Sequence, residues 1–489
     1  MLQALANIFK IKDLRSKIMF TIGMLMIYRI GFWIPVPGID QTRLAEFFAA
    51  QTGDGESGAF GRIATFVSTF SGGDFGQSTI FGLGIMPYIS AAIIFQLLGS
   101  AYEPLKKLKE EGPTGQQKIQ EYTRYTTIGL CIVQSFAWLG FISQQGMVYS
   151  GYANSPLWWV MSIACMTAGT TFLMWLGEQI DKYGIGNGVS LIITAGILSQ
   201  MPSAFIWVVD NSPMHTLFPF SYLADGPDGG ETQLSWMHVF LLFGSFFFVV
   251  AGAVVMTVAQ RRIPIQQAKH TRGRRVFGGQ RSFLPLRVNH GGVMPIIFAS
   301  SLMIFPSVIF SWMEEWARTN RLQNDPDGGI GLFEQTGSFL SDSFQMGAVP
   351  YVLVFIAMTY FFSYFWTTVQ FNPEEMSKQL RDNGSFVPGL RPGPRTTEYL
   401  ETVMERITYV GGGFLAVIAV IPMIVYAELN INFIVANFLG GTGLLIVVSV
   451  GLDFIQRIEA NLLMRNYAGF LGGDDRGGKG TRIRGPRSN

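Results

Sequence analysis

The stretch WMHVFLLFGSFFFVVAGAVVMTVA, residues 236–259, decides the fold class of this chain. It runs for more than 20 residues without an Asp, Glu, Lys or Arg. A helix needs about 20 consecutive, mostly apolar residues to cross the hydrocarbon core of a bilayer. This stretch therefore predicts a membrane-spanning helix.

Further stretches of the chain have the same character. They are residues 17–36, 79–101, 125–144, 157–177, 189–208, 292–312, 348–370, 403–426 and 433–454. The composition agrees, since 49% of the 489 residues are hydrophobic and only 14% are charged, whereas soluble proteins carry about 25% charged residues. We predict an all-α polytopic membrane protein with ten transmembrane helices.

The Lys and Arg residues are unevenly distributed between the two sides that these spans define. With the N-terminus placed in the cytoplasm, 30 of the 35 Lys and Arg residues fall in cytoplasmic segments. Because positive charge accumulates in cytoplasmic loops, we predict that both termini are cytoplasmic. Arg29 lies inside the first span, either as a buried structural cation paired with backbone carbonyls or as a functional one.

Residues that usually carry chemistry are scarce. The two Cys residues lie in apolar stretches, the four His residues lack metal-ligand spacing, and no nucleotide-binding motif is complete. We therefore expect no catalytic residue, no metal and no cofactor, and predict that the chain is not an enzyme. Mid-membrane carboxylates, which ion-coupled transporters use as relays, are also missing, and this disfavours a secondary solute transporter.

The segments between the spans differ in composition. Two cytoplasmic segments, 260–291 and 371–406, are long and basic, which favours docking of an anionic partner, either RNA phosphate or an acidic protein. The external segment 37–78 contains an apolar run at 61–70 that is too short to cross a bilayer. That run is either a re-entrant piece or an amphipathic helix on the outer surface.

Aliphatic side chains recur at helical spacing on two of the spans. Ile85, Ile89 and Ile93 face one way, as do Val189 and Ile193. Such stripes usually meet lipid or a neighbouring helix, and pore lining is the rarer alternative.

Prolines interrupt several predicted spans. They are Pro87 in the second, Pro295 and Pro306 in the seventh, and Pro422 in the ninth. Because a proline leaves a helical carbonyl without its partner, such breaks are often found near cavities.

Several distinctive motifs occur along the chain: IFGLGIMPYIS at 80–90, WLGEQI at 175–180, GIGNG at 184–188, FASS at 298–301, FNP at 371–373 and GLRPG at 389–393. Together they resemble the SecY family, whose members form the central subunit of the bacterial protein-conducting channel. The resemblance implies two inverted five-helix halves, residues 1–208 and 236–454, around an hourglass pore. Residues 209–235 would be the external hinge connection between them.

The resemblance also implies roles for individual residues. The pore constriction would be a ring of aliphatic side chains, namely Ile85, Ile89, Val189, Ile193, Ile297 and Ile446. A re-entrant plug near 61–75, in place of a surface helix, would include Ile63, Phe66, Phe70, Ser71, Gly72 and Gly73. A lateral gate would open between spans two and three and spans seven and eight, with polar positions at Gln96, Ser300 and Ser301.

Partners follow from the same resemblance. The cytoplasmic loops 260–291 and 371–402 would dock the motor SecA or the ribosome and its RNA. The residues implied in docking are Arg274, Arg275 and Arg391, with Tyr467 in the basic cytoplasmic tail 455–489. SecE and SecG would be membrane partners, and a second copy of the chain a further one. Signal peptides, nascent polypeptides and membrane lipids would be the ligands, in the bacterial cytoplasmic (inner) membrane.

The function expected from this resemblance is a gated conduit for unfolded secretory polypeptides that releases hydrophobic segments sideways into the bilayer. A partner motor or the ribosome would drive it. A secondary solute transporter with inverted repeats and a non-conducting scaffold that binds ribosomes are the alternatives. Polar substitution at Ile89 or Ile297 separates them, because it should make a channel leak ions and leave a scaffold unchanged.

Overall fold

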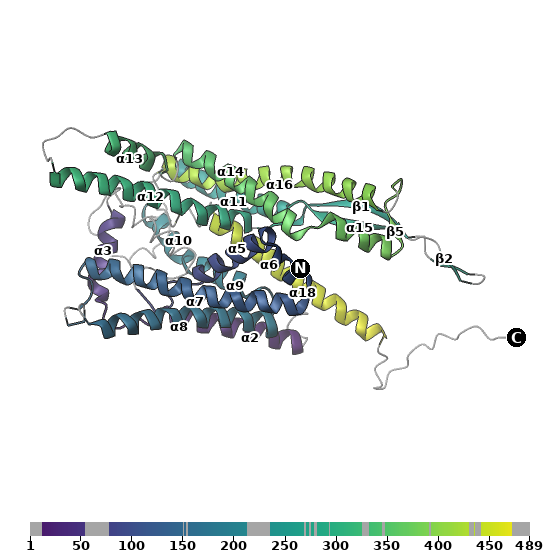
Figure 1. Cartoon of the computed structure of the whole chain (residues 1–489), viewed down its shortest axis with the longest axis horizontal. Helices are drawn as coiled ribbons and strands as arrows, with labels where there is room; N and C mark the ends of the chain where they lie inside the picture. Colours follow the sequence, from purple (N-terminus) through teal and green to yellow (C-terminus); the bar gives the residue numbers. More distant parts are fainter. Residues whose placement is uncertain are drawn as a thin grey trace.

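The computed structural model is a mostly helical protein (Figure 1). It describes residues 12–53, 78–149, 151–152, 155–212, 235–267, 270–272, 275–277, 281–292, 294–324, 332–344, 348–390, 393–429, 435 and 442–471. The helices of the first half of the chain are α2 (Lys12–Gly31), α3 (Gln41–Gly53), α5 (Met86–Ala101), α6 (Glu103–Glu110), α7 (Pro113–Gln144), α8 (Pro156–Tyr183), α9 (Gly188–Ser199) and α10 (Met201–Asp210). Those of the second half are α11 (Trp236–Val258), α12 (Met294–Asn324), α13 (Leu332–Ser343), α14 (Val349–Gln370), α15 (Pro373–Asp382), α16 (Pro394–Leu429) and α18 (Thr442–Leu471).

The predicted membrane spans coincide with helices. Within the described residues, six helices are long and apolar enough to cross a membrane: Pro113–Gln144, Pro156–Tyr183, Gly188–Asp210, Trp236–Val258, Val349–Asp382 and Pro394–Val425. The shorter helices Met86–Gly99 and Met294–Met303 are also apolar, and α2 and α18 overlap the first and last predicted spans. The prediction of an all-α polytopic membrane protein is confirmed.

Helix α5 begins differently from the prediction. Pro87 does not interrupt a helix but lies in its first turn, where the missing N–H has no helical partner to lose. The residues before it form turns, with Gly82 N donating to Thr79 O at 2.8 Å and Gly84 N donating to Phe81 O at 2.7 Å. Pro306, by contrast, does lie inside α12.

The long segment between the seventh and eighth predicted spans contains a pair of helices that lie side by side. Helix α12 continues to Asn324, and α13 runs back beside it at the left end of Figure 1. The hydroxyl of Ser307 donates to the carbonyl of Phe344 at 3.1 Å, and the rings of Phe310 and Phe344 lie 4.9 Å apart between centroids. These contacts fix the return of α13 onto α12.

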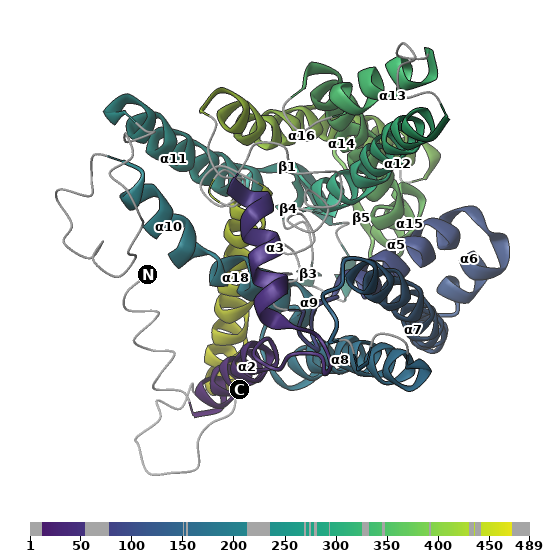
Figure 2. The ribbon, with the colours of Figure 1, turned by 90° about the vertical axis from the view of Figure 1, so that its left-hand side faces the viewer.

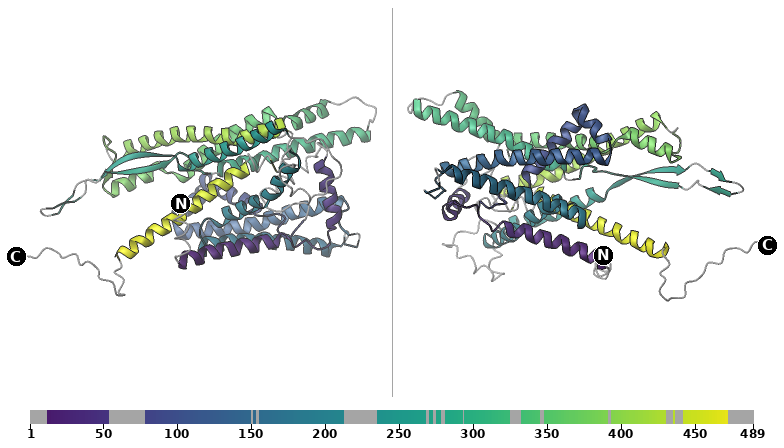
Figure 3. Two further views of the ribbon diagram at one scale, coloured as in Figure 1. Left: turned by 180° about the vertical axis from the view of Figure 1, so that it is seen from behind. Right: turned by 60° about the horizontal axis from the view of Figure 1, so that its bottom comes forward.

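The described residues of segment 260–291 include four strands, which the sequence analysis did not predict. Strands β1 (Gln260–Gln267) and β4 (Arg281–Arg287) pair antiparallel, and β5 (Ser385–Phe386) adds to β1 in the order β4-β1-β5. Strands β2 (His270–Arg272) and β3 (Arg275–Phe277) pair beyond them. Figure 3 shows this hairpin projecting from the helical body.

A single large apolar cluster joins the two halves of the chain. Its buried members come from α2, α5, α8, α9, α10, α11, α12, α14, α16 and α18 and from residues just before α5. Figures 1 and 2 place α9 and α18 between one group, α11 to α16, and another, α2, α7 and α8. The centre of the molecule is thus closed by apolar side chains from both halves.

Candidate functional site

The six residues predicted to form the constriction lie in this central cluster or against it. Five of them, Ile85, Ile89, Ile193, Ile297 and Ile446, are each at most 7% exposed and belong to the cluster. Val189 is half-buried and packs against it. Four separate helical regions, at α5, α9, α12 and α18, contribute these side chains.

The start of α5 positions the first two of them. Gly84 adopts a positive φ of 56°, which a residue with a side chain rarely does. This turn places Ile85 directly before the helix, and Ile89 N donates to Ile85 O at 3.1 Å. Ile85 and Ile89 therefore follow one another on a single face, as their spacing predicted.

The start of α9 positions Val189. The side chain of Asn187 caps the helix by accepting from Ser190 N at 3.1 Å, and Asp181 Oδ1 accepts from Gly188 N at 2.7 Å. A Cβ on Gly188 would collide with the carbonyl oxygen of Gly177 on α8. Only glycine allows α9 to begin this close to α8, so the GIGNG motif fixes where Val189 lies.

The three polar residues predicted for the lateral gate have different surroundings. Ser300 is 4% exposed on α12, and the Ser301 hydroxyl donates to the carbonyl of Ile297 in its own helix at 2.8 Å. Gln96 on α5 is exposed. Extensive packing joins α5 to α7 and α12 to α14, which are the two helix pairs on either side of the predicted gate.

Several predicted functional residues fall outside the part of the chain that the structure describes. The plug residues Ile63, Phe66, Phe70, Ser71, Gly72 and Gly73 lie in 54–77, and Arg274 and Arg391 also lie outside. Arg275 begins β3, and Tyr467 lies in α18. The two loops that would carry the docking residues are connected, since β5 of the second loop pairs with β1 of the first.

The β4-β1-β5 sheet packs on the helices through its own small apolar core. Ile263 of β1 and Leu286 of β4 are buried together with Leu400 and Val403 of α16. His290 follows β4, with its ring 5.7 Å from that of Phe371, and burial lowers the pKa of this imidazole. The apolar cluster therefore holds the sheet at a defined position on the helices.

Arg29, which falls inside the first predicted span, has an exposed side chain in the last turn of α2. Of the two interpretations given above, the buried structural cation is therefore wrong, and the functional cation stays a prediction. A long side chain near a helix end can extend toward the membrane–water interface while its stem covers apolar surface.

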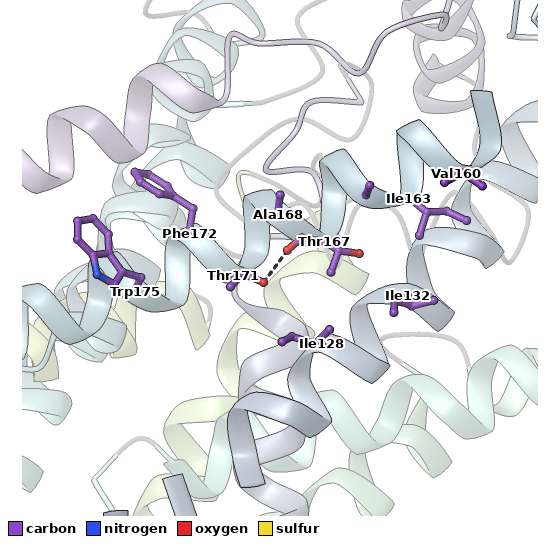
Figure 4. Close-up of a pocket in the computed structure, with 10 residues that line it drawn as sticks. Ile128, Ile132, Val160, Ile163, Thr167, Ala168, Thr171, Phe172 and Trp175 are labelled. Atoms are coloured by element: carbon purple, nitrogen blue, oxygen red, sulfur yellow. Dashed lines mark hydrogen bonds between the residues drawn. The ribbon is translucent and has the colours of Figure 1, made fainter. Parts of the chain in front are cut away.

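The described residues contain a pronounced groove on the faces of α7 and α8, with a volume of about 860 Å³. Figure 4 shows its lining, which is Ile128, Ile132, Val160, Ile163, Ala164, Thr167, Ala168, Thr171, Phe172 and Trp175. The Thr171 hydroxyl donates to the carbonyl of Thr167 at 2.8 Å. The lining has no charged side chain, so this groove lacks the carboxylates of an ion-coupled solute site.

The sequence analysis missed one charged contact between two of the long apolar helices. Arg124 on α7 and Glu178 on α8 form an ion pair through two nitrogen–oxygen contacts, at 2.8 and 2.7 Å. Their separation of 54 residues hides the pairing, and only the position of both at cytoplasmic margins of predicted spans could have suggested it. Within the described residues no group of three or more His, Cys, Asp or Glu could hold a metal ion.

Comparison with known sequences gives consistent matches. Residues 79–455 match the family model described as SecY. The protein translocase subunit SecY of Streptomyces coelicolor is 38% identical over 484 residues, which cover 96% of this chain and 100% of that protein. The protein translocase subunit SecY of Thermotoga maritima is 36% identical over 490 residues, covering all of both.

Solved structures share the fold. A structure described as that of a protein conducting channel aligns with a TM-score of 0.53 at 18% identity, covering 94% of each chain. Sec61 in a canine ribosome-channel complex aligns with a TM-score of 0.53 at 18% identity, covering 92% of this chain and 93% of that one. At this identity the likeness concerns the fold alone.

Proposed function

The chain belongs to the SecY family, and from this premise we propose that its six central aliphatic residues form the constriction of a protein-conducting channel. The protein is a multi-pass membrane protein and a channel subunit of a protein translocase, as its relatives are named. It passes unfolded polypeptide across the membrane.

The burial of the predicted ring residues in one cluster built from both halves is the observation that supports this constriction. Branched apolar side chains exclude water from a narrow passage, and a dry passage opposes ions because their hydration cannot be replaced there. The same side chains offer no directional bonds, so they can part around any sequence and close again. A constriction of this kind suits a substrate that varies in sequence.

We place the lateral gate between α5 with α7 and α12 with α14. Gln96, Ser300 and Ser301 are its polar positions, where a hydrogen bond between membrane helices contributes about 0.6 kcal/mol on average. A signal peptide or apolar segment enters between these helices and exchanges contacts with protein for contacts with lipid. The run at 61–75 serves as the plug that seals the external side.

Energy comes from partners that dock on the cytoplasmic side. SecA, or the ribosome through its RNA, binds the loops at Arg274, Arg275 and Arg391, with Tyr467 contributing from the tail. The sheet β4-β1-β5 supports this role, because it joins both loops into one body that is anchored on α16. SecE, SecG and a second copy of the chain are the membrane partners, and the bacterial inner membrane, with both chain termini in the cytoplasm, is the location.

A solute transporter is the alternative from another class of protein. The described groove on α7 and α8 is open and apolar, and the buried polar residues of the described part of the chain are all Ser or Thr, without an Asp or Glu among them. A coupled ion would therefore find no buried carboxylate ligand among the described residues. These features favour the channel.

Ion leak through the resting channel tests the proposal. Proteoliposomes carrying Ile89→Asn or Ile297→Asn should leak chloride faster than those carrying the unaltered chain, because a buried amide lets water into the constriction. The matched control is Val133→Asn, at a position on α7 that is 66% exposed. Leak at the unaltered rate from both constriction variants would contradict the proposal and leave the scaffold alternative.

A further inference from the structure

The ion pair between Arg124 and Glu178 connects α7 to α8 near their cytoplasmic ends. Arg124 Nε donates to Glu178 Oε1 at 2.8 Å, and Arg124 Nη2 donates to Glu178 Oε2 at 2.7 Å. The side chains are 40% and 23% exposed. Two parallel contacts from a planar guanidinium fix the orientation of both partners as well as their distance.

Glu178 belongs to the turn of α8 on which the next helix begins. A Cβ on the preceding residue, Gly177, would lie 3.5 Å from both Cγ2 and N of Val189. Gly188 lies against the carbonyl of Gly177, and Gly188 N donates to Asp181. The residues 177–181 of α8 therefore form a platform that supports the first turn of α9, and Val189 lies on that turn.

Arg124 belongs to the other element of this connection. It lies on α7, one of the helices of the proposed gate, and the ring of Tyr122 on the same helix stacks on Phe95 of α5 with 6.4 Å between centroids. The cytoplasmic end of the gate helices is thus linked by Arg124 to α8, and by α8 to the constriction. Phe95 is thus connected to Val189 by the ring stacking, the ion pair and the Gly177 contact, joined through the backbones of α7 and α8.

We infer that Arg124 and Glu178 are a positioning pair that couples the gate helix α7 to the constriction residue Val189. This inference rests on the proposed channel function. While the pair is formed, α7 is held against the platform and Val189 stays in the closed arrangement. When α7 moves outward to admit a signal peptide, the pair must stretch or carry α8 with it, and the support under Val189 changes.

The expected effect is moderate because both side chains are partly in water. An exposed ion pair is weak, and its two-point geometry makes this one stronger than a single contact. Reversal of one charge should raise the resting leak per channel about threefold to tenfold. Exchange of both charges should return the leak per channel most of the way to the rate of the unaltered chain, because the two side chains again attract each other.

The test measures chloride leak from proteoliposomes that contain the full-length chain together with its co-purifying subunits. The variants are Arg124→Glu, Glu178→Arg and the double exchange, and Ile89→Asn serves as the positive control for the constriction. Lys378→Glu is the matched charge reversal, because Lys378 pairs with Glu374 within one exposed helix and links no two membrane helices. Folded channel is quantified in the same vesicles, so that leak is expressed per channel.

Three results are distinguishable. Leaky single variants with a tight double exchange and a tight Lys378→Glu variant support the coupling. If Ile89→Asn leaks while the single reversals only lower the amount of folded protein, or if the double exchange leaks as much as they do, the pair is merely structural and the inference is overturned. If Ile89→Asn itself does not leak, the constriction proposal fails and the inference falls with it.

Discussion

Replacement of Gly188 by alanine should destabilise the channel through a collision that the structure locates. The added methyl group would overlap the carbonyl oxygen of Gly177, which is backbone in the middle of a packed helix and cannot rotate away. The start of α9 would have to move off α8, and overpacking of this kind costs about 1–3 kcal/mol. The hydrogen bond from Gly188 N to Asp181, 2.7 Å long, would be strained by the same movement.

Thermal unfolding in detergent, followed by tryptophan fluorescence, measures this cost. A loss of that size should lower the melting temperature by several degrees, since about 1 kcal/mol corresponds to 2–4 °C in domains of 150–250 residues. The displaced Val189 should also raise the resting ion leak of the same variant in vesicles. Both effects come from one movement and should appear together.

Alanine substitutions at three glycines with different amounts of free space test this prediction. A Cβ on Gly244 of α11 meets nothing within 4 Å, and a Cβ on Gly177 meets its nearest neighbours at an ordinary 3.5 Å. Gly244→Ala should therefore melt like the unaltered chain, Gly177→Ala close to it, and Gly188→Ala well below. Equal melting of all three variants would show that α9 does not begin where the structure places it.

Three further predictions concern burial in other parts of the fold. Burial keeps the pKa of His290 below its ordinary value, so below about pH 6.5 the unfolded chain binds a proton that the folded chain does not. The melting temperature of the unaltered chain should therefore fall from pH 8 to pH 5.5. The fall should be smaller in the His290→Gln variant, which lacks this titrating group. Trp158→Phe should cost about 1–2 kcal/mol because it removes the 2.9 Å bond to the carbonyl of Pro37, whereas Trp175→Phe, at an exposed position, should melt normally. Ile263→Ala should destabilise the packing of the β4-β1-β5 sheet by about 2–4 kcal/mol and speed protease cleavage within residues 260–287. Phe283→Ala should not, because the side chain of Phe283 is 58% exposed. Equal cleavage of both variants would contradict the anchoring of the sheet.

The membrane helices could be predicted from sequence because one physical property decides them. A run of about 20 apolar residues has few alternatives to a spanning helix, and the predicted spans each overlap a helix. The predicted boundary is wrong at the second span, where the helix begins several residues later than predicted. Residues 80–85 are apolar or Gly yet form turns, because two glycines and the proline at 87 favour a helix start at Met86.

The β4-β1-β5 sheet could not be predicted from the same property. The segment 260–267 alternates between exposed and buried only at Ile263 and Ile265, and its polar residues indicate a loop when read without the partner strand. Its core is completed by Leu400 and Val403, which lie more than a hundred residues further along the chain. Two alternating apolar residues are too short a pattern to predict a strand, and only contacts with residues distant in sequence stabilise it.

The constriction residues show a local sequence pattern, whereas the ion pair depends on a contact between residues distant in sequence. Ile85 and Ile89 show helical spacing, but only the family resemblance assigned them to a pore, since a stripe that faces lipid has the same pattern. Arg124 and Glu178 carry no pattern at all, because their contact depends on how α7 packs on α8. Arg29 was placed wrongly because its depth in a span does not tell which side of the helix faces the protein.

The central claim is that a translocating polypeptide passes the aliphatic constriction, and site-specific photocrosslinking tests it most directly. A photoreactive residue replaces Ile89 while a stalled secretory chain is engaged, and the control carries it at Val133, which is exposed on α7. The account predicts adducts with the polypeptide at position 89 that require an active signal sequence, and none of comparable yield at position 133. Absence of adducts at position 89, with the partner motor still bound through Arg391, would show that the chain docks a partner without conducting a polypeptide.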